Sequence, residues 1–325
     1  MEKRNLGRNG PSVAAIGYGA MVLEGYYGHS DDAEGVATIS EAMNLGMMID
    51  TADGYGNGHN EELVGRALAQ HGGEAFIATK FGIVFDENEE GTEFPTNWGF
   101  SLTVNGRPGY VSRAIDGSLR RLGVNTIDLL YLHFPDPAVP IEDTVGAMAE
   151  AVGAGKVAQI GLSNVTAEQT RRAHGVHPIA AVQYEYSLWR REAETELLPS
   201  LRELGISLVA WSPLGAGFLA GAMNAPAEGD FRQNNPRFAG ENLTANQDRF
   251  APLLDLAREI GVKPAQLALS WLLHQGPDII PIPGTRQVTH LRENADAAAI
   301  TLSEDSLAQI DRLAQPGATA GGTLL

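Results

Sequence analysis

The chain has 325 residues, of which 43% are hydrophobic and 19% charged, a composition that excludes a disordered protein and a length that fits one α/β barrel. Its 40 Asp and Glu residues outnumber 23 Lys and Arg, and the resulting net charge of −17 argues against nucleic acid or an anionic membrane surface as a partner. The absence of cysteine excludes disulfides, thiolate catalysis and cysteine-bound metal.

Short apolar runs alternate with amphipathic stretches along the whole chain. In one such stretch Ile115, Leu119 and Leu122 recur at spacings of four and three, which places them on one face of a helix. The apolar runs predict strands at residues 13–18, 47–49, 75–79, 127–132, 157–162, 179–182, 206–210 and 279–281. The amphipathic stretches predict helices at residues 32–45, 61–70, 113–122, 142–152, 167–174, 194–204, 247–260 and 289–297.

This alternation, with most strands apolar on both faces, predicts an α/β fold of the closed parallel (β/α)8 type, the TIM barrel. A doubly wound parallel sheet is the alternative, but it needs a glycine fingerprint after its first strand. The first predicted strand runs into Gly17-Tyr18-Gly19-Ala20-Met21, which lacks the third glycine. We therefore predict a single barrel domain over residues 1–325.

Further segments lie outside the strand–helix alternation. Residues 1–14 are expected to form a hairpin that closes the floor of the barrel. Residues 82–109 and 214–246 are long and rich in Gly, Asn and Pro, and each follows the end of a predicted strand. Long loops at that face of a barrel usually shape a substrate pocket, and we expect both segments to do so.

Polar side chains stand at the carboxyl ends of successive predicted strands. In a parallel barrel these ends converge on one rim, where barrel enzymes carry their active sites. One polar residue at a strand end is unremarkable, but a series of strands that each supply one indicates a built site. The residues are Asp50, Lys80, His133, Ser163 with Asn164, Gln183, and Trp211 with Ser212.

Four of the residues in this region would allow acid catalysis together, although none of them would do so alone. They are Asp50, Tyr55, Lys80 and His133. Taken singly, Lys80 is a solvated lysine at a strand end and His133 a half-buried histidine. A lysine that is anchored by a carboxylate and held near a phenol lowers the pKa of that phenol from about 10 towards the working pH. Tyr55 is then expected to act as a general acid towards a carbonyl oxygen, with His133 orienting the carbonyl or relaying a proton.

At these residues the sequence resembles the aldo-keto reductase superfamily. The resemblance covers essentially the whole chain in order, with similar spacings. It rests on IDTADGYGNGHNEELVGRAL at 49–68, ATKFG at 78–82, DLLYLHFPDP at 128–137, QIGLSN at 159–164, AVQYEYSL at 181–188, AWSPLGAGFLAG at 210–221 and PIPGTRQVTHLRENADA at 281–297. It implies a reductase that transfers hydride from NADPH to an aldehyde or ketone, with Asp50, Tyr55, Lys80 and His133 as the catalytic tetrad.

The resemblance also implies sites for each part of NADP(H). The residues that match those binding the nicotinamide carboxamide are Ser163, Asn164 and Gln183, and Trp211 matches the aromatic residue on which the nicotinamide ring stacks. The residues that match the pyrophosphate loop are Ser212, Leu214 and Gly217. Those that match the adenosine 2′-phosphate site are Gly284, Thr285 and Arg286, with Glu293 and Asn294 near adenine.

The chain departs from the family pattern at positions that bear on cofactor preference and substrate range. Ala216 stands where an arginine is frequent, which removes a contact to the pyrophosphate. Gln287 stands where a second basic residue often follows, so the 2′-phosphate would depend mainly on Arg286. Phe134 replaces an arginine that often follows the histidine, which makes the mouth of the barrel more apolar.

Other functions remain open on these residues. A regulatory protein that binds the cofactor, related to the β subunits of potassium channels, is one alternative, although the chain has an intact tetrad and no N-terminal inactivating extension. A Schiff-base barrel aldolase using Lys80 is another, but it would give the nicotinamide-binding residues no role. A glycosidase is the weakest, because the strand ends offer only one acid, Asp50.

The remaining expectations concern partners and location. The charged N-terminus is followed by no apolar stretch, and no window approaches the roughly 20 apolar residues of a spanning helix, which predicts a soluble cytoplasmic protein. The histidines form no pair with metal-ligand spacing, so we expect no metal. We expect a small carbonyl compound as the substrate and find no indication of an oligomer.

Overall fold

A curled sheet of parallel strands forms the centre of the structure, a computed structural model that describes residues 1–221 and 224–325. Within these residues eight strands are paired in the order β12-β11-β10-β9-β8-β5-β4-β3. They are β3 (Tyr18–Gly19), β4 (Ile49–Asp50), β5 (Ile77–Phe81), β8 (Ile127–Leu132), β9 (Val157–Ser163), β10 (Ala181–Glu185), β11 (Ser207–Trp211) and β12 (Ile279–Pro281). The edges meet where Gly17 N donates to Pro281 O at 2.9 Å and Gly19 N donates to Pro283 O at 3.3 Å. The predicted (β/α)8 fold is confirmed.

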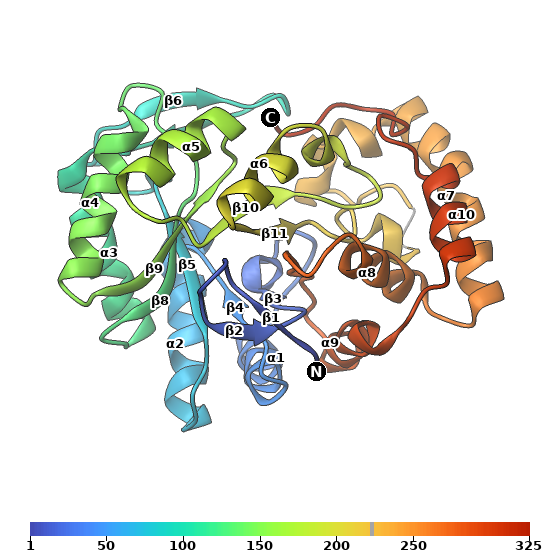
Figure 1. The fold of residues 1–325 in the computed structure, drawn as a ribbon, viewed down its shortest axis with the longest axis horizontal. Coiled ribbons are helices and arrows are strands. Elements are labelled where there is room, and N and C mark those ends of the chain that lie inside the picture. The colour runs from blue at the N-terminus through green and yellow to red at the C-terminus, as the bar shows by residue number, and fades with distance from the viewer. Residues whose placement is uncertain (222–223) are drawn as a thin grey trace.

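The helices surround this sheet on the outside (Figure 1). They are α1 (Asp32–Asn44), α2 (His59–His71), α3 (Pro108–Leu122), α4 (Ile141–Gly153), α5 (Ala167–Val176), α6 (Leu197–Leu204), α7 (Gly240–Ile260), α8 (Pro264–His274), α9 (Val288–Asp296) and α10 (Glu304–Leu313). Their apolar faces and the outer faces of the strands form one large hydrophobic core. None of the helices in the described residues is both long and apolar enough to cross a membrane.

The N-terminal residues form the predicted hairpin. Strands β1 (Lys3–Asn5) and β2 (Ser12–Ala14) pair antiparallel, and the hairpin lies in front of the barrel strands in Figure 1. Leu6 is fully buried and packs into the core inside the barrel, among Met48, Ala78, Leu129, Val209 and Ile280. Arg4 fastens the hairpin to the end of α8 and to β12 by donating to the carbonyl oxygens of Leu273, Gly276 and Ile279.

The long excursions leave the carboxyl ends of β5 and β11. The first contains a small antiparallel hairpin of β6 (Thr92–Pro95) and β7 (Ser101–Val104). The second contains the short 3₁₀ helices η4 (Phe218–Ala220), η5 (Phe231–Asn234) and η6 (Pro236–Phe238) and the beginning of α7; residues 222–223 of this predicted excursion lie outside the described residues. Both excursions therefore lie at the face of the barrel where the sequence places its polar residues.

The structure differs from the prediction at particular elements. The run 13–18 is not one strand, because residues 15–17 carry the chain from the floor hairpin into the barrel between β2 and β3. Helix α8 was not predicted, since residues 267–273 are all buried and the sequence has no polar face to show a helical period. Helix α10 was also missed, and α7 begins at Gly240 rather than at 247.

Candidate active site

Asp50, Tyr55, Lys80 and His133 meet at the carboxyl ends of β4, β5 and β8. Lys80 Nζ donates to Asp50 Oδ1 at 2.6 Å, to the carbonyl oxygen of Thr51 at 2.7 Å and to Tyr55 Oη at 3.1 Å. The rings of Tyr55 and His133 are 5.7 Å apart and meet edge to face. Asp50, Lys80 and His133 are buried. The predicted tetrad therefore forms one contiguous, water-poor cluster.

A tight turn after β4 places the phenol of Tyr55 over Lys80. The turn is the 3₁₀ segment η2 (Tyr55–Gly58), in which Asn57 adopts a left-handed conformation with φ of 55°. Buried side chains at the start of α2 hold the turn in place. Thr51 Oγ1 donates to Asn60 Oδ1 at 2.7 Å, and Asn60 Nδ2 donates to the carbonyl oxygen of Ala20 at 3.0 Å. Because these contacts join the end of β4, the start of α2 and η1 (Ala20–Glu24), the position of Tyr55 is set by the barrel rather than by the turn alone.

The charge state of the cluster follows from burial and from the Asp50–Lys80 pair. Burial raises the pKa of Asp50, and the ammonium and the amide of Gln183 oppose that shift. Burial disfavours the charged form of Lys80, but the attraction of Asp50 and Tyr55 leaves the pKa of Lys80 raised, so it remains an ammonium. Burial and the charge of Lys80 hold the pKa of His133 well below its usual range, so the imidazole is neutral.

The pKa of Tyr55 moves in the direction opposite to the one expected from sequence. Lys80 does lower it, as predicted, but burial of the phenol is the larger effect and leaves the pKa raised above 10. The expected net fall of this pKa is therefore wrong for this structure. The physical reason is that the phenolate loses more hydration than one ammonium at 3.1 Å restores. Tyr55 is consequently protonated at neutral pH.

The residues matched to nicotinamide binding lie directly beside this cluster. Gln183 Nε2 donates to Asp50 Oδ2 at 2.6 Å, so it touches the tetrad itself. Asn164 has a left-handed backbone with φ of 58°, and its Nδ2 donates to Ser163 Oγ at 3.0 Å and to His133 O at 3.1 Å. Trp211 ends β11 at the register position of Glu185 on β10. All four predicted residues thus lie at the carboxyl ends of β9, β10 and β11, and Gln183 and Asn164 contact the tetrad directly.

The residues matched to the pyrophosphate loop form a compact turn after β11. Ser212 is left-handed, its Oγ accepts from Ala216 N at 3.2 Å, and Leu214 O accepts from Gly217 N at 3.1 Å. Glycine is required at 215, where a Cβ would lie 2.6 Å from the ring of Trp189. The arginine that the family pattern leads one to expect at 216 is absent, but Arg232 Nη1 donates to Ala216 O at 3.1 Å.

The residues matched to the adenosine end lie further round the rim, between β12 and α9. Gly284 packs against Gly19, and Thr285 O accepts from Tyr18 Oη at 2.8 Å. Asn294 is buried on α9. Glu293 is paired with Lys263 at 2.5 Å. The guanidinium of Arg286 donates to backbone carbonyl oxygens of residues 27–29. These residues share one segment but do not contact the tetrad.

Sequence reasoning missed several aromatic residues at the mouth of the barrel. Phe231 of the second excursion packs against Tyr26 at 5.8 Å, against Trp98 at 6.2 Å and against Phe100 at 5.7 Å between ring centroids. Phe134 stacks on His133 at 5.0 Å, in line with the predicted apolar mouth. The aromatic content of the excursions was visible in the sequence, but their mutual contacts were not.

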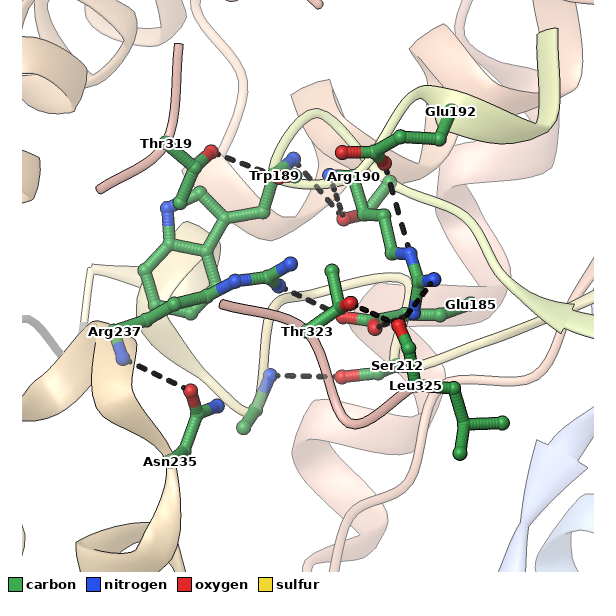
Figure 2. Close-up of polar contacts among 12 residues, drawn as sticks. Glu185, Trp189, Arg190, Glu192, Ser212, Asn235, Arg237, Thr319, Thr323 and Leu325 are labelled. Carbon is green, nitrogen blue, oxygen red and sulfur yellow. Dashed lines mark hydrogen bonds and ion pairs between the residues drawn. The ribbon is translucent and has the colours of Figure 1, made fainter. Parts of the chain in front are cut away.

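A buried ion cluster fastens the second excursion to the rim (Figure 2). Glu185 at the end of β10 pairs with Arg190 at 2.7 Å and with Arg237 of η6 at 2.8 Å, and all are nearly inaccessible to solvent. Arg237 lies over the ring of Trp189, which itself contacts the turn after β11. The cluster therefore links the strand that carries Gln183 to the turn matched to the pyrophosphate.

Two rim residues carry buried polar atoms for which the described part of the protein supplies no partner. Within the described residues no hydrogen-bond partner reaches the buried His133 Nδ1 or Trp211 Nε1. Buried polar atoms of this kind usually have a partner in native proteins. The donor set, with an amide, a hydroxyl and an indole beside a protonated phenol, fits a nicotinamide and a carbonyl compound.

Comparison with known proteins points to one family over nearly the whole chain. The family described as "Aldo/keto reductase family" matches residues 15–315. A soybean (Glycine max) protein named "Probable aldo-keto reductase 1" is 43% identical over 323 residues, which cover 98% of this chain and 90% of that protein.

Solved structures agree with this match. A glycerol dehydrogenase from Gluconobacter oxydans has a TM-score of 0.83 and 29% identity, covering 99% of this chain and 98% of that one. An aldo/keto reductase from Klebsiella pneumoniae in complex with NADP and acetate has a TM-score of 0.74 and 26% identity, covering 100% and 99%. The fold is therefore shared with these proteins over nearly their whole length.

Proposed function

The chain belongs to the aldo/keto reductase family, and from that premise we propose that it reduces an aldehyde or ketone with hydride from NADPH, using Tyr55 as the proton donor. The observation that supports the role of Tyr55 is its phenol, protonated and 3.1 Å from the buried ammonium of Lys80. The Klebsiella structure, solved with NADP, supports the choice of cofactor. We also propose that the whole chain acts as one domain, since one sheet collects all the residues of the site.

The cofactor supplies hydride from the nicotinamide ring, and the chain supplies orientation and the proton. Tyr55 Oη gives its proton to the oxygen of the substrate carbonyl as charge develops there. Lys80 donates to that same phenol oxygen and stabilises the negative charge left on it. Asp50 holds Lys80 in place, and the neutral imidazole of His133 can donate a hydrogen bond to the carbonyl without competing as a stronger acid.

The residues beside the tetrad fit the nicotinamide end of NADPH. Asn164, Ser163 and Gln183 present amide and hydroxyl groups to a carboxamide, and Trp211 presents an aromatic face. The turn from Ser212 to Gly217 would hold the pyrophosphate, with Arg232 as the cation on its backbone. Gly284, Thr285 and Arg286 would hold the 2′-phosphate, and Glu293 and Asn294 would lie near adenine.

The alternative of a Schiff-base aldolase finds no support at Lys80. A Schiff-base lysine must reach its neutral form at working pH, which requires a lowered pKa. Here the attraction of Asp50 and Tyr55 overcomes burial and leaves the pKa of Lys80 raised. Lys80 Nζ also donates hydrogen bonds to the carboxylate of Asp50, the carbonyl oxygen of Thr51 and the phenol oxygen of Tyr55.

The test is a panel of aldehydes and ketones assayed by loss of nicotinamide absorbance with NADPH and, in parallel, with NADH. The proposal expects multiple turnovers with NADPH for at least one carbonyl class. Tight binding of NADPH without turnover on any carbonyl would favour the regulatory protein related to potassium-channel β subunits. Trapping of a substrate on Lys80 by borohydride would instead support the aldolase.

A further inference from the structure

The segment between η1 (Ala20–Glu24) and α1 touches both the catalytic turn and the predicted 2′-phosphate site. We call residues 25–29 the 25–29 loop. Gly28 has φ of 104°, a backbone conformation that residues with a Cβ rarely adopt, so the path of the loop depends on this glycine. The loop carries Tyr26 and Tyr27 towards the mouth of the barrel.

One side of the loop lies against η2, the turn that carries Tyr55. Gly56, the residue after Tyr55, donates its N–H to Tyr26 Oη at 3.4 Å. Tyr26 also packs against Phe231, and Tyr26 O accepts from Phe231 N at 2.8 Å. The loop therefore lies between the turn that carries Tyr55 and Phe231 of the second excursion.

The other side of the loop is held by Arg286. Arg286 Nη1 donates to the carbonyl oxygens of Gly28 and His29, and Nη2 donates to that of Tyr27 at 3.2 Å. The backbone of Arg286 is fixed, because its carbonyl oxygen accepts from Thr38 Oγ1 of α1 at 3.2 Å. The guanidinium is thus the link between a rigid part of the barrel and the loop.

We propose that Arg286 couples the adenosine 2′-phosphate site to the substrate site: a phosphate bound at its guanidinium steadies the 25–29 loop and so tightens binding of the carbonyl substrate. The inference rests on the proposed function, because it takes Arg286 as the 2′-phosphate residue. The inference goes beyond the proposed function because it gives Arg286 a positioning role at the mouth of the barrel. Arg286 acts there through the 25–29 loop and does not touch the substrate.

The physical basis is that one planar cation serves both partners. A guanidinium has five N–H donors in a rigid fork, so it can bond a phosphate while keeping its bonds to the loop carbonyls. A charge-assisted bond to phosphate restricts the rotamers of the arginine, and the loop bonded to it then loses mobility as well. Coupling of binding free energies is reciprocal, so a bound carbonyl compound must in turn tighten NADPH more than NADH.

The first test compares the KM for one carbonyl substrate at saturating NADPH and at saturating NADH. We expect the KM to be about fivefold lower with NADPH, the lower end of usual coupling. Arg286→Ala should raise the KM with NADPH to the NADH value. Arg286→Lys, a point charge without the fork, should retain more affinity for NADPH than Arg286→Ala but lose the difference in KM.

Arg292→Ala is the matched control. Arg292 is an exposed arginine on α9 that pairs with Glu41 at 2.8 Å, and its removal should leave the ratio of the two KM values unchanged. A readout without turnover is amide hydrogen exchange of residues 24–31 in the wild-type protein. Adenosine 2′,5′-bisphosphate should slow this exchange, and adenosine 5′-diphosphate, which lacks the 2′-phosphate, should not.

The outcomes separate this inference from the proposed function. Equal KM values with both cofactors in the wild-type enzyme, or equal exchange with both nucleotides, would overturn the coupling while leaving a carbonyl reductase intact. Faster exchange with the 2′-phosphate ligand would also overturn it, because it would show that the phosphate pulls Arg286 away from the loop. Absence of both NADP⁺ binding and carbonyl turnover would overturn the proposed function itself.

Discussion

Lys80 shows how one buried side chain sets the chemistry of its neighbours. It is inaccessible to solvent and bonds Asp50 and Tyr55 at once. Burial lowers the pKa of His133, and the charge of Lys80 lowers it further. Burial alone would make Tyr55 a very weak acid, and Lys80 is the group that opposes this. The acidity of Tyr55 is therefore a balance between the hydration that its phenolate loses on burial and the attraction of that phenolate to the ammonium of Lys80.

Because the pKa of Tyr55 is raised, carbonyl reduction should be independent of pH through the neutral range and should fall only above about pH 10, where the phenol loses its proton. Lys80→Met removes the opposing charge. It should lower kcat about 100-fold or more and move the alkaline limb to higher pH. The measurement is the pH profile of kcat at saturating NADPH. A limb that stays in place while kcat falls would mean that Lys80 has only a structural role.

At the scale of elements, His59 joins η2, the turn that carries Tyr55, to η1 and α1. His59 Nδ1 lies 3.1 Å from Glu24 Oε2, and Nε2 lies 3.3 Å from Asp32 Oδ2. Burial opposes the charged imidazole, but the bonds to Glu24 and Asp32 outweigh it and raise the pKa of His59. The link is therefore strongest when the imidazole is protonated.

The sign of the pH dependence follows from the raised pKa. The contribution of His59 is fully present below the unfolded pKa of about 6.5 and is lost as pH rises through the folded pKa. His59→Gln should therefore lower Tm more at pH 6 than at pH 8.5, measured against wild type at each pH. An equal difference at both pH values would show that the ring contributes packing and not charge.

The Glu185 cluster fastens a different set of elements. Glu185→Gln leaves Arg190 and Arg237 buried without their carboxylate, and removal of one partner of a buried ion pair costs about 3–5 kcal/mol. Urea unfolding should show this loss in the free energy of unfolding. Glu192→Gln is the control, because Glu192 is 53% exposed and 3.6 Å from Arg190, and it should change stability by less than about 0.5 kcal/mol. A similar loss in both variants would contradict the role given to burial.

At the scale of the whole molecule, the barrel was predictable because its strands are short, apolar and regularly spaced. The rim residues were predictable as well, since the carboxyl ends of parallel strands must converge. Helix α8 was not predictable, because a helix that is buried on all sides has no periodic alternation of apolar and polar residues. The direction in which the pKa of Tyr55 shifts was not predictable either, because it depends on how deeply the fold buries the phenol.

Contacts between distant loops were the least predictable part of the site. Arg286 could be matched to a phosphate from its motif, but its bonds to residues 27–29 join segments about 258 positions apart. Likewise the approach of Arg232 to Ala216 follows from the path of the second excursion. Such contacts depend on where the barrel brings the loops, which local sequence patterns do not encode.

The central claim, that Tyr55 is the proton donor of a carbonyl reductase, is tested most directly by Tyr55→Phe, with NADP⁺ binding followed by quenching of tryptophan fluorescence and turnover followed alongside. Only the proton given in the transition state is removed, so kcat should fall by about 10²–10⁴-fold while the affinity for NADP⁺ is unchanged. Tyr110→Phe, which removes a phenol of α3 that donates to the carbonyl oxygen of Ile83, should keep normal turnover. Near-normal turnover in Tyr55→Phe would contradict the account.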